Sequence, residues 1–247
     1  MSALVTYSIP EPRIALIAIE RPQKKNAINT QIVEELTAAW ARFEAGEERV
    51  AILTGYKDEV FTGGADLKDM PPDFWKCIPG AGSPVSKPLI AATAGLCVGG
   101  GMVLVAMCDL AVAAENTVFA YPEAQVGYTG GMISNLAARI PHKIAMEIMM
   151  LGESVGAHRA YEAGYVNKVV PVGRQVEVAL QMARRLEASS PVILRTLKKY
   201  VGEVLPKGPS EAAAMVRREL MEVNGSADAI EGLASFREKR KPSFPGR

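Results

Sequence analysis

The chain has few of the residues that disulfide-linked and metal-binding proteins need. It holds three cysteines and two histidines in 247 residues. The cysteines show no Cys-x-x-Cys spacing, and Cys97 and Cys108, unlike Cys77, lie in strongly apolar stretches. The histidines, His142 and His158, have no partner at the spacing of a metal site. These absences predict reduced, buried thiols and no bound metal.

Long apolar runs and an excess of one charge are missing as well. Glycine or a charged residue interrupts each apolar stretch well before it could span a membrane. The first residues lack the basic start and apolar stretch of a secretory signal. A formal net charge of +1 gives no electrostatic reason to bind nucleic acid or an anionic membrane. We therefore expect a cytoplasmic protein that has neither nucleic acid nor a membrane as its partner.

The residues that are present indicate strands that alternate with helices. Short apolar runs bounded by turn residues predict strands at 14–22, 49–55, 88–95, 109–114 and 117–123. Residues 29–46 have helical spacing, with Asn29 as the N-cap and Gly46 as the stop. From about residue 134 helices dominate, with one brief strand at 165–171. The pattern predicts an α/β core of ββα-like or βαβ units at 1–190, followed by a helical region at 191–247.

Three adjacent glycines, at 99–101, interrupt the apolar stretch LCVGGGMVLVAMCD. A strand that ends in glycines and opens a helix presents free backbone N–H groups to a negative group. The spacing fits no nucleotide-binding fingerprint, which leaves two interpretations. The amides stabilise an oxyanion on a carbonyl, or the glycines serve close packing of helix and strand, and on this stretch alone packing is at least as well supported.

Two further stretches have the same character. VFTGGADLKDM, at 60–70, is a second glycine-rich turn after a strand, so it could supply a second amide. YPEAQVG places Glu123 at the end of a predicted strand. Its carboxylate is either a surface group or a half-buried acid/base, and spacing alone favours the surface group.

A family resemblance covers nearly the whole chain. The motifs together are similar to those of the crotonase superfamily, also called the enoyl-CoA hydratase/isomerase family: RPQKKNAIN, FTGGADLKDM, KPLIAATAGLCVGGG, YPEAQVG, IAMEIMMLGESVGAHRAYEAGYVNKVVP and EGLASFREKRKPSF. The resemblance implies a crotonase-like spiral of ββα units with a helical C-terminal trimerisation region. It also implies a homotrimer or a dimer of trimers.

The resemblance assigns catalytic roles to three positions. The backbone N–H groups of Ala65 and Gly100 would hold the oxygen of an acyl-CoA thioester, and Glu123 would act as the acid/base. The family's hydratases carry a second glutamate, but Val103 stands at that position here. One base can still move a proton between carbons, so the resemblance favours double-bond isomerisation or a related one-base reaction. Coenzyme A would enter as part of the substrate, and no other cofactor is implied.

The resemblance also nominates substrate-binding positions. Those near the oxyanion segments are Lys25, Ala27, Gly64, Ala65, Asp66, Leu67, Lys68 and Gly100, with Lys24 as a further phosphate partner. Each lysine taken alone is better interpreted as solvated. Tyr128 is a further substrate-binding candidate that could point into the acyl pocket, although packing is the better supported interpretation. Phe236 and Lys239, in the tail, could reach the ligand of the same or a neighbouring subunit. Phe74 and Trp75 could cover a small or aromatic acyl group, or simply pack in their loop.

Several functions fit this set of residues. The leading hypothesis is an acyl-CoA lyase or isomerase of crotonase type with one glutamate. The alternatives are a hydroxycinnamoyl-CoA-type hydratase-lyase, a decarboxylase or C–C hydrolase on the same scaffold, and a non-catalytic acyl-CoA binder.

Overall fold

The main sheet runs through the centre of the body and has six strands. The structure, a computed structural model, describes residues 2–247. The strand order is β1-β2-β3-β5-β7-β10. β1 (Val5–Glu11) and β2 (Ile14–Ile19) are antiparallel, and every later neighbour pair is parallel: β3 (Val50–Gly55), β5 (Leu89–Thr93), β7 (Leu110–Ala114) and β10 (Lys168–Val170). Parallel pairing requires a crossover between strands, and short strands lie in the crossovers that follow β3, β5 and β7.

These short strands form a second sheet in the order β4-β6-β8-β9. β4 (Val60–Thr62), β6 (Leu96–Val98) and β8 (Val118–Ala120) are parallel, and β9 (Val155–Gly156) is antiparallel to β8. Each of the three follows a strand of the main sheet, so the predicted ββα-like unit is confirmed. Because the three strands are parallel neighbours, their carboxyl ends lie at one edge. The two glycine-rich stretches and YPEAQVG leave the strands at this edge.

Side chains alternate between the two faces of the main sheet. Ala51 and Leu53 of β3 face one core cluster, which includes the buried face of α1 (Thr30–Ala45). Val50 and Ile52 face the other cluster, which α6 (Gln175–Glu187) covers. The period of two along the strand places successive side chains on opposite faces. Helices on both faces explain why the parallel strands are apolar throughout.

The helix predicted at 29–46 is confirmed with both of its ends. The side chain of Asn29 accepts a hydrogen bond from the Ile32 amide at 3.2 Å, and Gly46 follows the last helical residue. One face of the helix is buried, as helical spacing of apolar residues requires: Ile32, Leu36, Ala39, Trp40 and Phe43.

The remaining helices connect the strands and form the C-terminal region. The short ones are η1 (Pro22–Lys24), η2 (Phe74–Cys77), α2 (Gly100–Ala106), α3 (Glu123–Val126), η3 (Met132–Ala138) and α5 (Ala157–Glu162). The longer ones are α4 (His142–Leu151), α7 (Pro191–Val204), α8 (Pro209–Asn224) and α9 (Ala227–Arg237). Along residues 2–247, no helix combines the length and apolarity needed to cross a bilayer.

Two local expectations are wrong, and one strand was not anticipated. The strand predicted at 117–123 ends at Ala120, and Glu123 opens the short helix α3 instead. The segment at 134–140 is mostly a 3-10 helix rather than an α-helix. β1 was not anticipated, because Pro10, Glu11 and polar residues break its apolar pattern. Its antiparallel pairing with β2 forms one edge of the sheet.

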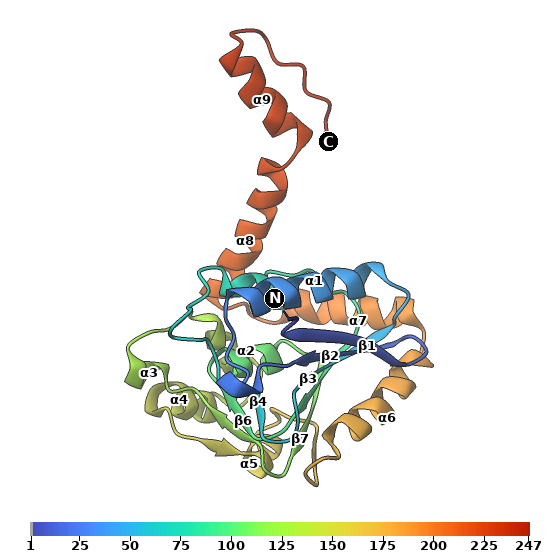
Figure 1. The fold of residues 1–247 in the computed structure, drawn as a ribbon, viewed down its shortest axis with the longest axis vertical. Helices are drawn as coiled ribbons and strands as arrows, with labels where there is room; N and C mark the ends of the chain where they lie inside the picture. Colours follow the sequence, from blue (N-terminus) through green and yellow to red (C-terminus); the bar gives the residue numbers. More distant parts are fainter. Residues whose placement is uncertain (1) are drawn as a thin grey trace.

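The helical region at 191–247 has two parts. α7 lies against the body, where Lys198 Nζ donates to the Asp109 carboxylate at 2.8 Å. α8 and α9 extend away from the body as an arm, which comprises residues 209–247 (Figure 1). The division into regions at 190/191 stays a prediction.

Candidate active site

The two glycine-rich turns touch one another at the edge of the second sheet. A Cβ on Gly64 would lie 3.0 Å from the carbonyl oxygen of Val98 and 3.7 Å from the Cα of Gly99. Gly64 has a φ of 89° and Gly99 a φ of 56°. Both values fall in the left-handed region that glycine occupies without strain. The glycines therefore allow two backbones to approach each other as well as to turn.

Each turn presents an amide next to this contact. The backbone on both sides of Ala65 is fixed, since the Ile28 amide donates to the Gly64 carbonyl and the Asp66 amide to the Ile28 carbonyl, each at 2.8 Å. Gly100 is the first residue of α2. Within residues 2–247 neither the Ala65 nor the Gly100 amide donates to an internal acceptor. Two unused donors on touching turns are the arrangement that an oxyanion requires.

Glu123 lies over the same turns. A Cβ on Gly99 would stand 2.6 Å from Glu123 Oε1, so the carboxyl group covers this glycine. Glu123 Oε2 is buried and has no hydrogen-bond partner among the residues that the structure describes. Burial raises the pKa of Glu123 from its ordinary value of 4.5 to about 7. The interpretation of Glu123 as a surface group, which spacing alone favoured, is therefore wrong, because its carboxyl group lies against the glycine turns.

A cavity of about 350 Å³ joins these groups. Ala65, Gly100 and Glu123 line it, together with apolar and aromatic side chains. Val103 lies one turn after Gly100 on α2, faces the same cavity and is 4% exposed. Glu123 is thus the only carboxylate on the lining within residues 2–247.

Aromatic residues shape the cavity near the amides. Phe74 and Trp75 line it, and a Cβ on Gly100 would overlap the ring of Phe74. Gly100 therefore serves two purposes, since it leaves room for this ring and keeps the amide unobstructed. Both side chains also pack against the main core cluster, so the structure agrees with the packing interpretation, and their role in covering an acyl group stays a prediction.

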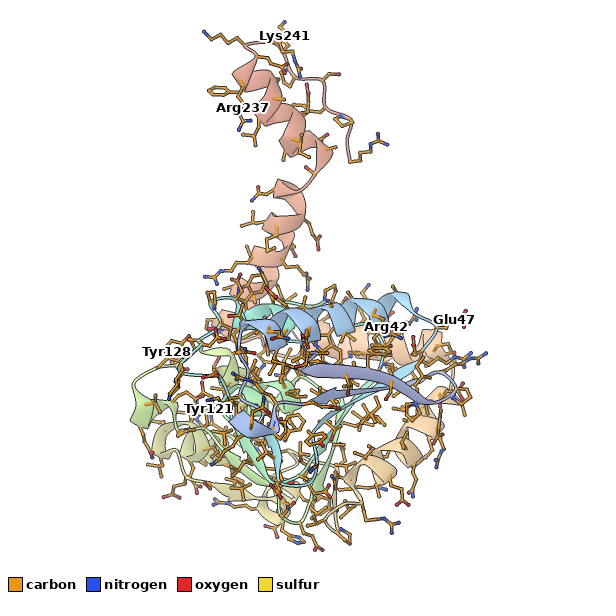
Figure 2. All side chains as sticks on the ribbon, in the orientation of Figure 1. Arg42, Glu47, Tyr121, Tyr128, Arg237 and Lys241 are labelled. Atoms are coloured by element: carbon orange, nitrogen blue, oxygen red, sulfur yellow. The ribbon has the colours of Figure 1, made fainter. Side chains whose placement is uncertain are left out.

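Tyr128 also lines the cavity and is 52% exposed, which favours the acyl pocket over packing, and its contact with a substrate stays a prediction. Tyr121, which sequence reasoning did not single out, lies on the same side of the molecule (Figure 2). Its hydroxyl is 2.7 Å from Thr129 Oγ1, and this contact ties down the turn that carries Tyr128. Burial raises the pKa of Tyr121 to about 12, so its phenol keeps its proton at neutral pH.

The positions nominated for the CoA portion surround Ala65. Gly63 donates its amide to the Lys25 carbonyl at 2.8 Å, and the Lys25 side chain is exposed. Leu67 is 65% exposed, and the side chains of Lys24 and Lys68 are exposed as well. The structure brings these positions together, and their contacts with a ligand stay a prediction.

Asp66 has a structural partner that sequence reasoning missed. Arg21 Nη1 donates to the Asp66 carboxylate at 2.6 Å and to the Ala27 carbonyl at 2.9 Å. Hydrogen bonds from Arg21 and from the Lys68 amide hold the pKa of Asp66 below its ordinary value. Asp66 and Ala27 thus fix the turn that presents the Ala65 amide. Arg21 stands at the start of the RPQKKNAIN motif, but no spacing rule links it to residue 66.

The tail positions lie elsewhere in this chain. Phe236 is in α9 and is 84% exposed, and Lys239 follows the helix. Neither lines the cavity of its own chain. Figure 2 shows their neighbours Arg237 and Lys241 at the far end of the arm. Four residues of α8 line the cavity instead, none of them anticipated: Ser210, Ala213, Ala214 and Arg217.

The site thus brings together two backbone amides without acceptors inside residues 2–247, one carboxyl group and a cavity lined largely by apolar side chains. No cluster of metal-ligating side chains occurs in the described part of the chain. The family model "Enoyl-CoA hydratase/isomerase" matches residues 11–247, and the chain belongs to that family. It is therefore an acyl-CoA enzyme with the crotonase fold, as the motifs indicated.

Relatives match over nearly their whole length. The mitochondrial enoyl-CoA hydratase of Pongo abelii is 31% identical, with 96% of this chain and 87% of the relative covered. A probable enoyl-CoA hydratase of Rhizobium meliloti is 32% identical, with 95% of each chain covered. The crystal structure of an enoyl-CoA hydratase from Mycobacterium tuberculosis H37Rv superimposes with a TM-score of 0.76 at 32% identity and covers 100% of both chains.

Proposed function

We propose that this protein catalyses a one-base reaction on a CoA thioester, with migration of a double bond as the favoured reaction. One observation carries the proposal: Glu123 is the only carboxylate lining the cavity within residues 2–247, and Val103 closes the wall near Gly100. A hydration that uses one acid and one base needs two groups that transfer protons. An isomerisation needs one group that removes a proton from one carbon and returns it to another.

The geometry supports each step of this reaction. The thioester oxygen accepts hydrogen bonds from the Ala65 and Gly100 amides. These donors stabilise the negative charge that develops on this oxygen when the neighbouring carbon loses its proton. Glu123 covers Gly99 beside these amides, where it can reach that proton. A pKa of about 7 suits a group that must both accept and release a proton at neutral pH.

Hydration, with or without carbon–carbon cleavage, is the second candidate. The relatives reported above are named enoyl-CoA hydratases. The aromatic side chains of Phe74, Trp75, Tyr121 and Tyr128 on the cavity also favour a planar acyl group of the hydroxycinnamoyl type. Decarboxylation and C–C hydrolysis differ from these reactions in their products, and simple acyl-CoA binding forms no product.

A panel of CoA thioesters followed by mass spectrometry and NMR tests the proposal. We expect the wild-type protein to interconvert enoyl-CoA positional isomers without a mass change, and Glu123→Gln to lose most turnover while it still binds the thioester. The exposed Glu47→Gln variant, distant from Tyr121 in Figure 2, is the matched control and should keep full turnover. A gain of one water, a loss of carbon dioxide or full turnover in Glu123→Gln would each contradict the isomerase assignment.

We also propose that the chain assembles as a homotrimer or a dimer of trimers. The exposed apolar side chains of the C-terminal helices support this assembly: Val192, Ile193, Leu197, Tyr200, Val201, Val204, Val216, Leu220, Met221, Ile230, Leu233 and Phe236. So many exposed apolar residues mark a surface that is buried in an assembly. In it, Phe236 and Lys239 would approach a neighbouring site. Light scattering should give three or six chains, and a monomer would refute the proposal. The cytoplasmic location stays a prediction.

A further inference from the structure

The wall of the cavity formed by α8 carries a single cation. Ser210, Ala213, Ala214 and Arg217 line the cavity at helical spacings of three, four and seven, so one face of α8 forms this wall. Arg217 is the only arginine or lysine on the cavity lining within residues 2–247. The small side chains that precede it leave space for a ligand along the helix.

The guanidinium of Arg217 has no partner inside the chain. It makes no hydrogen bond or ion pair with any residue of the described range 2–247. Arg217 is close enough to Asp73 to help lower the pKa of this carboxyl group, but Asp73 already accepts hydrogen bonds from other side chains. It accepts from Lys76 Nζ at 2.7 Å and from Trp75 Nε1 at 3.2 Å.

Arg218, the next residue on α8, has a structural role that Arg217 lacks in the described part of the chain. Arg218 Nη1 donates to the Ala81 carbonyl at 2.8 Å, so Arg218 holds α8 against the body. Arg217 lines the cavity and makes no such contact with residues 2–247. An apolar cavity needs no cation for its own stability, and an arginine presents a planar fork of donors that matches a carboxylate.

We infer that Arg217 binds a carboxylate at the far end of the acyl group, so that the substrate is the mono-CoA thioester of a short dicarboxylic acid. This inference rests on the proposed function, because it places the reacting carbons at Glu123. Ser210 lies against Gly131, in the loop after α3, and Arg217 is about 10 Å farther along the helix. Whenever Glu123 is ionised, its charge also repels a substrate carboxylate from the catalytic end, so Arg217 and Glu123 together orient the acyl chain.

The acyl end is a better partner for Arg217 than the CoA phosphates. Lys24, Lys25 and Lys68 are exposed near the Ala65 turn, outside the cavity lining, where they offer charge to the phosphates. A phosphate partner would make Arg217 equally important for every CoA thioester, whereas a carboxylate partner makes it important for one class. A variant without Arg217 should therefore lose affinity for every CoA thioester if the partner is a phosphate, and for carboxylate-bearing thioesters alone if the partner is the acyl end.

Binding of unreactive thioesters tests the inference without any turnover. Calorimetry with adipoyl-CoA and hexanoyl-CoA compares a carboxylate with a methyl group at the end of the same chain. We expect the wild type to bind adipoyl-CoA at least tenfold more tightly, with a preference that weakens as salt screens the exposed arginine. Arg217→Met should abolish the preference and leave hexanoyl-CoA binding unchanged, and Arg217→Lys should keep part of it. The exposed Arg185→Met variant, on α6, is the matched control.

Three results would overturn the inference. An equal loss of both thioesters in Arg217→Met would assign the arginine to the CoA portion. If the wild type binds adipoyl-CoA and hexanoyl-CoA equally well, the protein has no carboxylate subsite. If Arg217→Met still prefers adipoyl-CoA, the subsite lies elsewhere. Because none of these measurements needs catalysis, an inactive wild type that shows the preference would refute the proposed function and keep this inference.

Discussion

The buried carboxyl group of Glu123 makes the stability of this protein depend on pH in a defined direction. Glu123 Oε2 has no partner within residues 2–247, and burial raises the pKa of the group from 4.5 to about 7. In the unfolded chain the glutamate loses its proton near its ordinary pKa. Between these two values the folded protein holds a proton that the unfolded chain has released. The free energy of unfolding therefore falls as the pH rises through this window.

The pKa difference sets the size of the effect. At full burial it would correspond to roughly 3 kcal/mol, but solvent reaches part of the side chain, so we expect about 1 to 2 kcal/mol. Glu123→Gln removes the ionisation and keeps the shape of the protonated acid. The variant should thus be more stable than the wild type at about pH 8 and close to it at about pH 5.

Thermal unfolding of both proteins at the two pH values measures this difference. For a chain of this length, about 1 kcal/mol shifts Tm by roughly 2 to 4 °C. Glu47→Gln, in the exposed turn after α1, should show the same Tm difference from the wild type at both pH values. If Glu123→Gln is less stable than the wild type at about pH 8, Glu123 has a partner that stabilises its ionised form, and the description of the site is wrong.

Further predictions follow from the same residues. If Glu123 acts as a base, kcat/KM should fall as the pH drops below about 7, with the midpoint at the pKa of this group in the free enzyme. Gly100→Ala should lower kcat on the order of 100-fold or more, because the new methyl group overlaps the ring of Phe74 and displaces the amide; adding Phe74→Ala should restore part of the rate, and no restoration would place the damage elsewhere. Val103→Glu should produce measurable hydration of an enoyl-CoA, and a variant that folds without any water addition would show that this position faces no substrate.

Local sequence signals predicted the elements that local interactions determine. Asn29 and Gly46 delimit α1 because capping depends on residues within one turn of the helix end. The two glycine turns were recognised from their clustered glycines, and the φ values of 89° and 56° explain why glycine stands at two of these positions. The motifs assigned the amides of Ala65 and Gly100, whose place on touching turns follows from the pairing of β4, β6 and β8.

Long-range contacts explain what the sequence alone missed. Glu123 was interpreted as exposed because the groups that cover it are distant in the chain, and Tyr128 was interpreted as packed for the same reason. Arg21 pairs with Asp66 across 45 residues, and no periodicity reports such a contact. Arg217 belongs to an ordinary amphipathic helix until the fold places that helix beside the cavity.

Exchange of the hydrogens next to the thioester carbonyl tests the central claim most directly. An unreactive saturated acyl-CoA is incubated with the protein in deuterated water, and mass spectrometry counts the deuterium that enters the acyl chain. The account predicts enzyme-dependent exchange in the wild type and its loss in Glu123→Gln at unchanged affinity for the thioester. Wild-type protein that binds the thioester tightly yet exchanges no hydrogen would contradict it.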